Sequence, residues 1–237
     1  MKPKLFLIPV TLGDTEAEAV IPKNVISIIH SLDEFIVENL RSARRFLRKA
    51  GYQKDFDQEV VFYEIGKHHN ALEIEEMLQL RSRTKHLGML SEAGVPCIAD
   101  PGSTITRVFQ RHGFPVVPLV GPSSILLSLM ASGFNGQNFA FHGYLPIDKN
   151  ELKVKLKQLE KAAIQHDQTQ IFIETPFRNQ KMLEAIFTYC AGPTQLCIAS
   201  NLTAEEEFVI TRSITDWKQH PPDIHKKPVV FLLYKPD

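Results

Sequence analysis

Short apolar runs alternate with polar stretches along the chain, and turns that contain glycine or proline separate most of them. Compact runs rich in branched and aromatic side chains predict strands, whereas apolar residues spaced three and four positions apart predict amphipathic helices. Strands are predicted at 4–8, 34–37, 59–65, 86–90, 116–119, 139–145, 171–174, 196–199, 208–214 and 229–234, and helices at 25–32, 41–50, 71–80, 103–112, 125–131, 152–163 and 180–189. This alternation of strands and helices predicts an α/β fold.

The turns within residues 86–124 form the densest such group in the chain. Residues 91–96, 99–102 and 121–124 lie beside apolar runs, and residues 9–14 follow the first predicted strand. The carboxyl ends of parallel strands meet at one edge of a sheet, where the ligands of α/β proteins bind. The glycines in these turns allow close backbone approach, and the prolines stiffen them. Each turn alone could be an ordinary connection, but their proximity favours a ligand site.

The composition is that of a globular protein without an excess of either charge. The 237 residues include 27 Lys and Arg and 27 Asp and Glu, so the net charge of zero gives no general attraction for polyanions. A local basic face remains, because Arg41, Arg44, Arg45 and Arg48 fall on one side of a predicted helix. This face is either simply solvated or a surface that contacts phosphates or a partner.

Targeting and metal-binding patterns are absent from the sequence. No apolar run approaches the roughly 20 residues of a membrane span, and the N-terminus lacks a signal pattern, so a cytoplasmic protein is expected. The three cysteines lack C-x-x-C spacing, and the adjacent His68 and His69 would point in different directions, so no metal site is predicted. The change of composition after Gly133 and the turn at Gly121 predict an N-terminal α/β domain, 1–120, and a C-terminal one, 121–237.

Several turn motifs follow one another in a distinctive order. They are PVTLGD at 9–14, ENLR at 38–41, HHN at 68–70, SEAGVP at 91–96, DPG at 100–102, VGPS at 120–123, GYLP at 143–146 and ETPFR at 174–178. The motifs and their order resemble the tetrapyrrole methylase superfamily. Within it they are most similar to the family that 2′-O-methylates a cytidine of 16S ribosomal RNA with S-adenosylmethionine. The resemblance spans nearly the whole chain.

This resemblance implies a two-domain tetrapyrrole-methylase-like α/β fold with a cofactor cleft between the domains, S-adenosylmethionine as the cofactor, and a homodimer. It implies cofactor-binding positions at Pro9, Gly94, Val95, Pro96, Asp100, Pro122, Ser123, Ser124, Thr175 and Leu202. S-adenosylmethionine has no phosphate, so a phosphate-binding loop is not required. Backbone groups of the turns can bind its adenine and methionine parts. The helix start at Ser123 and Ser124 offers N–H groups to the cofactor's carboxylate, although these serines could equally cap the helix.

Polar groups at the ends of predicted strands are the candidates for catalysis. A ribose hydroxyl is a weak nucleophile near neutral pH and gains from a nearby base. The candidates are Glu38, Glu174 and Arg178. Each could equally form a structural ion pair, so no catalytic base is assigned.

Several residues depart from the family pattern, so the resemblance does not fix the identity of the methyl-accepting substrate. Asn39 stands in place of an acid, Glu92 in place of Asp, Val95 in place of Thr, Ser200-Asn201 in place of Arg-Glu, and Ala204 in place of Lys. These changes weaken the expectation of a ribosomal target more than that of the cofactor. A 2′-O-methyltransferase of ribosomal RNA, with the small ribosomal subunit as partner and no membrane, is favoured. The alternatives are a methyltransferase of a non-RNA substrate and a catalytically silent cofactor-binding module.

Overall fold

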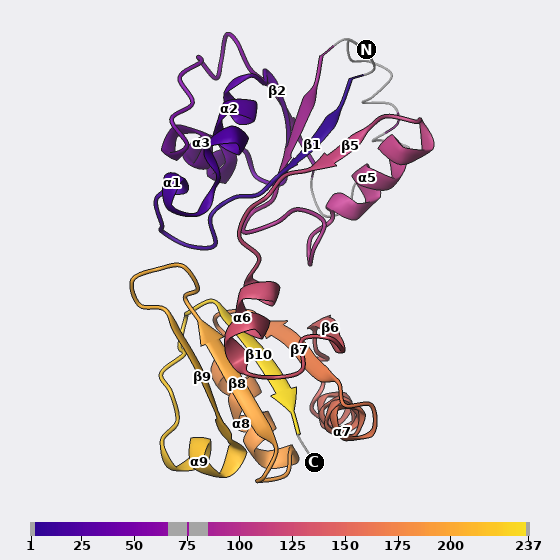
Figure 1. Cartoon of the computed structure of the whole chain (residues 1–237), viewed down its shortest axis with the longest axis vertical. Coiled ribbons are helices and arrows are strands. Elements are labelled where there is room, and N and C mark those ends of the chain that lie inside the picture. The colour runs from indigo at the N-terminus through magenta and orange to yellow at the C-terminus, as the bar shows by residue number, and fades with distance from the viewer. Residues whose placement is uncertain (1–2, 66–74, 76–84, 236–237) are drawn as a thin grey trace. The chain divides into compact units, whose positions relative to one another are not determined.

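The computed structural model describes residues 3–65, 75 and 85–235 (Figure 1). The HHN motif at 68–70, with His68 and His69, lies outside these residues, as does the helix predicted at 71–80 except for residue 75. The chain divides into two compact units, Met1–Ser123 and Ser124–Asp237, whereas the division predicted from the sequence lies between residues 120 and 121. Within the described residues, no helix is both long enough and apolar enough to span a bilayer.

The first unit is built on a five-stranded sheet in the order β3-β2-β4-β1-β5. Its strands are β1 Leu5–Ile8, β2 Glu34–Val37, β3 Val61–Glu64, β4 Leu87–Leu90 and β5 Val116–Pro118. Every neighbouring pair is parallel. Strands β2 and β4 are buried at every position, as in parallel sheets that are covered on both faces.

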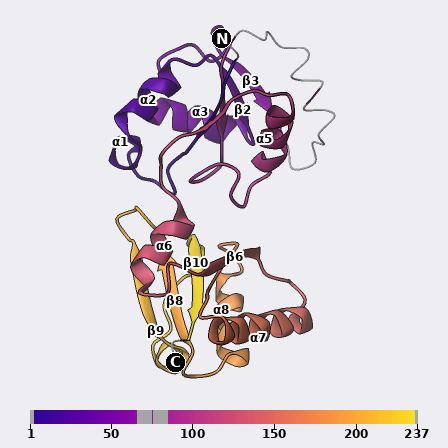
Figure 2. The ribbon, with the colours of Figure 1, turned by 45° about the vertical axis from the view of Figure 1, so that its right-hand side comes forward.

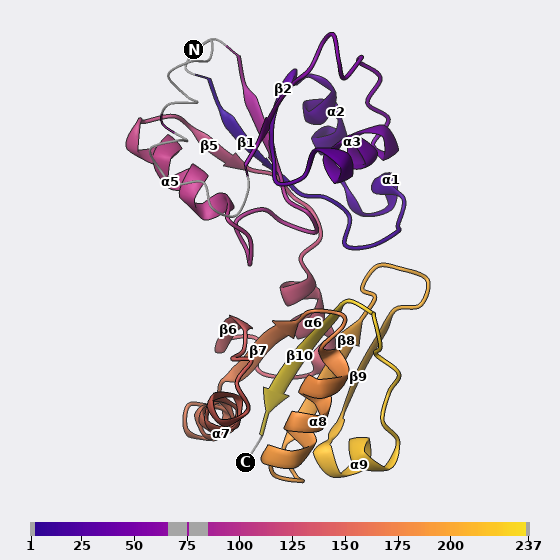
Figure 3. The ribbon, with the colours of Figure 1, turned by 180° about the vertical axis from the view of Figure 1, so that it is seen from behind.

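Helices cover both faces of this sheet (Figures 1 and 3). One face carries α1 Ala17–Val20, α2 Lys23–His30 and α3 Leu40–Lys49, and the other carries α5 Gly102–Arg111. Successive side chains of a strand point to opposite faces, so each strand contributes to two cores. Phe35 of β2 packs with α2 and α3, whereas its neighbour Ile36 packs with α5.

The second unit has a mixed five-stranded sheet in the order β6-β7-β10-β8-β9. Its strands are β6 Phe139–Tyr144, β7 Thr169–Glu174, β8 Gln195–Ser200, β9 Phe208–Ser213 and β10 Val229–Tyr234. Strands β6 and β7 are parallel, and the other neighbouring pairs are antiparallel. The last strand in sequence, β10, thus lies in the centre of the sheet, which explains why its run VVFLLY is almost wholly buried.

One face of the second sheet is covered by α7 Lys149–Gln165, α8 Asn179–Tyr189 and α9 Ile214–Gln219. These helices bury their apolar side chains, including Trp217, against Phe172 and Phe231 of the sheet. The other face carries α6 Ser124–Ser132, as the opposite views of Figures 1 and 3 and the oblique view of Figure 2 show. Helices α1 and α9 were not predicted, because four and six residues are too short to show helical periodicity.

The basic face predicted on α3 is partly taken up by packing. Arg44 forms an ion pair with Asp57 at 2.7 Å, and its guanidinium lies 5.5 Å from the ring centres of both Phe56 and Phe62. Arg48 lies 3.9 Å from the ring centre of Phe56. The segment after α3 thus folds back and places aromatic rings against these two arginines, while Arg48 stays exposed, so a solvated face and a surface for phosphates or a partner remain the two alternatives.

Candidate functional site

Three turns at the carboxyl ends of neighbouring strands touch one another in the first unit. The backbone N–H of Val10, after β1, donates a 2.9 Å hydrogen bond to the carbonyl of Gly94, after β4. A Cβ atom on Gly94 would lie 3.3 Å from the carbonyl oxygen of Pro122, and one on Gly121 would lie 2.3 Å from the side chain of Pro9. Gly94 also has a φ of +70°, which glycine adopts without strain. The structure therefore brings together the predicted positions Pro9, Gly94 and Pro122.

A pocket lies beside these turns, at the carboxyl ends of β2 and β4. The chain leaves β2 for α3 on one face of the sheet and leaves β4 for α5 on the other. Adjacent strands whose chains depart to opposite faces leave a crevice, which is where open α/β sheets bind ligands. The pocket is small and partly open to solvent. It is lined by Ile36, Val37, Glu38, Ile65, Met89, Leu90, Pro96, Asp100, Pro101, Gly102 and Ile105.

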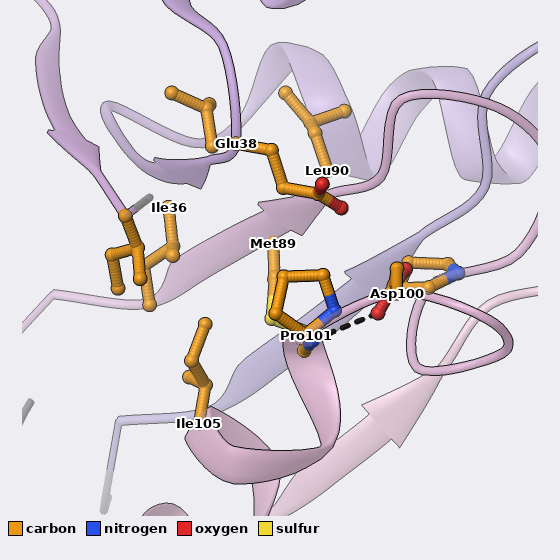
Figure 4. Close-up of a pocket in the computed structure, with 11 residues that line it drawn as sticks. Ile36, Glu38, Met89, Leu90, Asp100, Pro101 and Ile105 are labelled. Atoms are coloured by element: carbon orange, nitrogen blue, oxygen red, sulfur yellow. Dashed lines mark hydrogen bonds between the residues drawn. The ribbon is translucent and has the colours of Figure 1, made fainter. Parts of the chain in front are cut away.

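The walls of the pocket differ in chemistry (Figure 4). Ile36 and Ile105 form an apolar wall on one side, whereas the carboxylates of Glu38 and Asp100 lie on the other. An apolar wall accommodates a flat ring, and carboxylates accept hydrogen bonds from hydroxyl or amino groups. The lining is thus mainly apolar, with two carboxylates on one side.

Asp100 organises the turn that closes the pocket. Its Oδ1 accepts hydrogen bonds of 2.8 Å from the backbone N–H groups of both Cys97 and Gly102. Burial raises the pKa of Asp100, and these two hydrogen bonds reduce the rise without cancelling it. Cys97 and Ala99 have φ values of 70° and 61°, a left-handed conformation that is strained for residues other than glycine. Such strain persists only where the surroundings enforce it, and it gathers at ligand sites.

Two positions that depart from the family pattern are joined to each other. The side chain of Asn39 caps α3 by accepting a 3.0 Å hydrogen bond from the backbone N–H of Ser42. The hydroxyl of Ser42 in turn donates a 2.5 Å hydrogen bond to Glu92. Asn39 and Glu92 therefore connect the turn after β2 with the turn after β4, on either side of the crevice.

In the second unit, Glu174 and Arg178 pair with each other. Arg178 Nη2 lies 3.0 Å from Glu174 Oε2, and the Glu174 side chain is 1% exposed. The other carboxylate oxygen accepts a 2.6 Å hydrogen bond from the backbone N–H of Thr175. The pair matches the structural alternative considered for these two residues, and it holds the turn at the carboxyl end of β7. Leu202, at the corresponding end of β8, is a buried core residue.

The predicted site residues thus fall into separate groups. Glu38, Pro96 and Asp100 line the pocket, and Pro9, Gly94, Val95 and Pro122 belong to the adjoining turns. Ser123 is the last residue of the first unit, and Ser124 is the first residue of α6 and of the second unit. The second unit also contains Glu174, Thr175, Arg178 and Leu202. The apolar lining residues were missed, because their pattern is that of any buried strand or helix. Among the described residues, no cluster of His, Cys, Asp or Glu is suited to a metal ion.

Comparison with known proteins identifies the family. Residues 4–217 match the family model for tetrapyrrole (corrin/porphyrin) methylases. Ribosomal RNA small subunit methyltransferase I of Bacillus subtilis (strain 168) is 30% identical over 212 residues, which are 90% of this chain and 68% of that protein.

Solved structures with the same fold include the methyltransferase CobJ, with a TM-score of 0.63 at 15% identity over 98% of this chain and 93% of that one. A uroporphyrin-III C-methyltransferase from Thermus thermophilus, complexed with S-adenosyl homocysteine, has a TM-score of 0.57 at 12% identity over 98% and 97% of the two chains. These similarities confirm the predicted α/β fold. The chain belongs to the tetrapyrrole methylase family and is an S-adenosylmethionine-dependent methyltransferase.

Proposed function

We propose that the pocket and its adjoining turns bind S-adenosylmethionine, and that the methyl acceptor is a ribose 2′-hydroxyl of small-subunit ribosomal RNA. The donor set fits this cofactor. The apolar wall of Ile36 and Ile105 suits adenine, and the carboxylate of Glu38 would accept hydrogen bonds from ribose hydroxyls. The similar structure that is complexed with S-adenosyl homocysteine supports the choice of cofactor.

The chain's own residues have defined tasks in this proposal. When bound, S-adenosylmethionine supplies an electrophilic methyl group for in-line displacement by the acceptor oxygen. The close contacts of Gly94 and Gly121 keep the turns rigid, and rigid positioning is the main requirement of such a reaction. The apolar lining excludes water. Of the three catalytic candidates, Glu38 lines the pocket, and Glu174 and Arg178 form an ion pair in the second unit.

The proposal that ribosomal RNA is the substrate rests on the relatives that are named ribosomal RNA small subunit methyltransferase I. The zero net charge and the packing of Arg44 and Arg48 on aromatic rings favour the second candidate, a methyltransferase of a non-RNA substrate. A catalytically silent cofactor-binding module is the third. Binding of the cofactor without turnover on any ribosomal fraction would select that third function.

Calorimetry tests the cofactor proposal. S-adenosylmethionine and S-adenosylhomocysteine should each bind the full chain with a Kd in the micromolar range, because the pocket and the turns are already formed. ATP, which shares the adenosine part but carries phosphates, is the matched control and should bind far more weakly, since the pocket offers carboxylates. The absence of both heat and a thermal shift at millimolar S-adenosylhomocysteine would contradict the proposal.

A homodimer is the proposed assembly, and α6 supplies the support. The helix has no charged residue, and its side chains Leu126 and Met130 are 51% and 78% exposed while Ile125 and Leu129 are buried. Exposed apolar side chains on a helix without charges are typical of a contact surface, so a second copy is the proposed cover for Leu126 and Met130.

Met130→Glu should convert the dimer to a monomer in light scattering, because a carboxylate would be buried in the interface. The matched control is Ile164→Glu, which changes a side chain of α7 that is 43% exposed and should leave the mass unchanged. A monomeric wild-type chain at tens of micromolar, or a dimeric Met130→Glu variant, would contradict the assembly proposed.

A further inference from the structure

Phe177 presents an aromatic ring to solvent from a tightly held turn. It lies between β7 and α8 and is 74% exposed. Besides the Glu174–Arg178 pair, a 2.9 Å hydrogen bond from the backbone N–H of Arg178 to the carbonyl of Thr175 closes the turn. A large apolar ring on a stiff support loses little conformational freedom when it binds a partner.

A basic loop adjoins this turn. The backbone N–H of Lys226 donates a 3.2 Å hydrogen bond to the carbonyl of Pro176, and the side chain of Asn179 donates a 2.6 Å hydrogen bond to the carbonyl of Lys227. Lys226 is exposed and has a φ of 57°, a strained conformation for lysine. The two loops that carry an exposed lysine and an exposed phenylalanine are therefore joined through their backbones.

A second exposed ring lies at the same end of the sheet. Tyr144 is 58% exposed and pairs with Ile173 at the carboxyl ends of the parallel strands β6 and β7. The register of this pair of strands shifts between Phe141 and Tyr144, and Gly143 has a φ of +62°. Irregularities of this kind re-aim side chains and are frequent beside functional sites.

We infer that Tyr144, Phe177 and Lys226 form an aromatic platform that binds an unpaired stretch of the RNA substrate. The inference rests on the proposed function and extends it to the way the substrate is held. Unpaired bases stack on aromatic rings, and lysines contact the phosphates that connect them. Glu205 and Glu206 are exposed on the loop between β8 and β9, at the other side of the sheet from β6 and β7. Their carboxylates would repel a phosphate chain, so RNA is expected to bind on the side of β6 and β7.

Fluorescence anisotropy with a short, labelled, single-stranded RNA oligonucleotide tests the platform. Phe177→Ala should weaken binding by at least about fivefold, since stacking of a single base on an aromatic side chain has an effect of this size. Phe177→Trp should bind like the wild type, and RNA should quench the fluorescence of the new indole. Affinity for S-adenosylhomocysteine should not change in either variant, and this measurement also reports that the variants are folded.

Two further variants separate stacking from charge. Lys226→Asn removes the ammonium group but keeps a residue that tolerates positive φ, and it should make the log–log salt slope shallower by about one. Phe139→Ala is the matched control for Phe177→Ala. It removes a phenylalanine that is 40% exposed at the opposite end of β6, and it should bind RNA like the wild type.

The outcomes distinguish the platform from the proposed function. If the wild type binds the RNA and Phe177→Ala binds it equally well, the platform is overturned, whether or not methyl groups are transferred to ribosomal RNA. If binding depends on Phe177 but no methyl group reaches ribosomal RNA, the platform stands and the proposed reaction fails. A wild-type chain that does not bind single-stranded RNA at low salt overturns the platform as well.

Discussion

The Asp100→Ala variant is expected to lose about 2–4 kcal/mol of folding free energy, because two backbone N–H groups lose their shared acceptor. Both N–H groups, of Cys97 and Gly102, bond the same carboxylate oxygen at 2.8 Å in a turn that already contains strained residues. Relaxation of this turn would also displace the wall of the pocket, so affinity for S-adenosylhomocysteine should fall together with stability. Urea unfolding and calorimetry measure the two effects.

Asp100→Asn is the matched control, since an amide oxygen can accept the same two hydrogen bonds. The variant should retain the stability that the alanine variant loses. Because burial raises the pKa of Asp100 in the folded state, ionisation of this carboxyl opposes folding, and the wild type loses stability as the pH rises through that pKa. Asp100→Asn should therefore gain stability relative to the wild type over this pH range. Equal stability of the wild type and Asp100→Ala would show that the carboxylate does not hold the turn.

The Glu160→Ala variant is expected to lose about 3 kcal/mol in the second unit, because a buried carboxylate holds two groups there. Glu160 of α7 is 7% exposed, and its Oε1 accepts 2.6 Å hydrogen bonds from the backbone N–H of Ala191 and the hydroxyl of Thr194. Lys157 lies 3.2 Å from the other oxygen but is 53% exposed, so this ion pair contributes little. The carboxylate thus attaches α7 to the loop between α8 and β8.

The pH dependence of stability provides a second check on Glu160. Burial raises the pKa of this group, but the hydrogen bonds from Thr194, Ala191 and Lys157 outweigh burial and lower it below its ordinary value of 4.5. A lowered pKa contributes stability above the unfolded value that is lost as the pH falls through the folded one. Glu160→Gln keeps a hydrogen-bond acceptor without the charge, so it should lose less stability than the wild type as the pH falls. Unfolding curves that are identical for the wild type and Glu160→Ala would contradict the assigned role.

The sheets were predictable because strands and helices leave different periodicities in the sequence. The buried run at 34–37 and the helical spacing of apolar positions at 25–32 are local signals. The strand forms at the predicted residues, and the helix forms at Lys23–His30, two residues earlier than predicted. The packing of Arg48 on Phe56 is not a local signal. Helical spacing correctly placed Arg48 on an exposed face, but the ring beneath it comes from a different segment and leaves no trace in that spacing.

The site was predictable only in its polar and glycine-rich parts. A Cβ atom on Gly121 would collide with Pro9, and Gly94 has a φ of +70°, so both glycines are required by the turns and mark them in the sequence. The pocket's apolar wall has no such signature, because Ile36 and Ile105 follow the same pattern as core residues. The left-handed conformation of Cys97 was not predictable either, since it is imposed by a hydrogen bond to Asp100 three residues later.

Transfer of a labelled methyl group from S-adenosylmethionine to small ribosomal subunits tests the proposed function most directly. The subunits come from a strain that lacks this protein, so that the acceptor nucleotide is unmodified, and subunits from the parent strain are the control. We predict that the label enters the RNA of the deficient subunits as a 2′-O-methylated cytidine, and that the parental subunits accept little. Label that appears in neither RNA, or only in protein, would contradict the assignment of ribosomal RNA as the substrate.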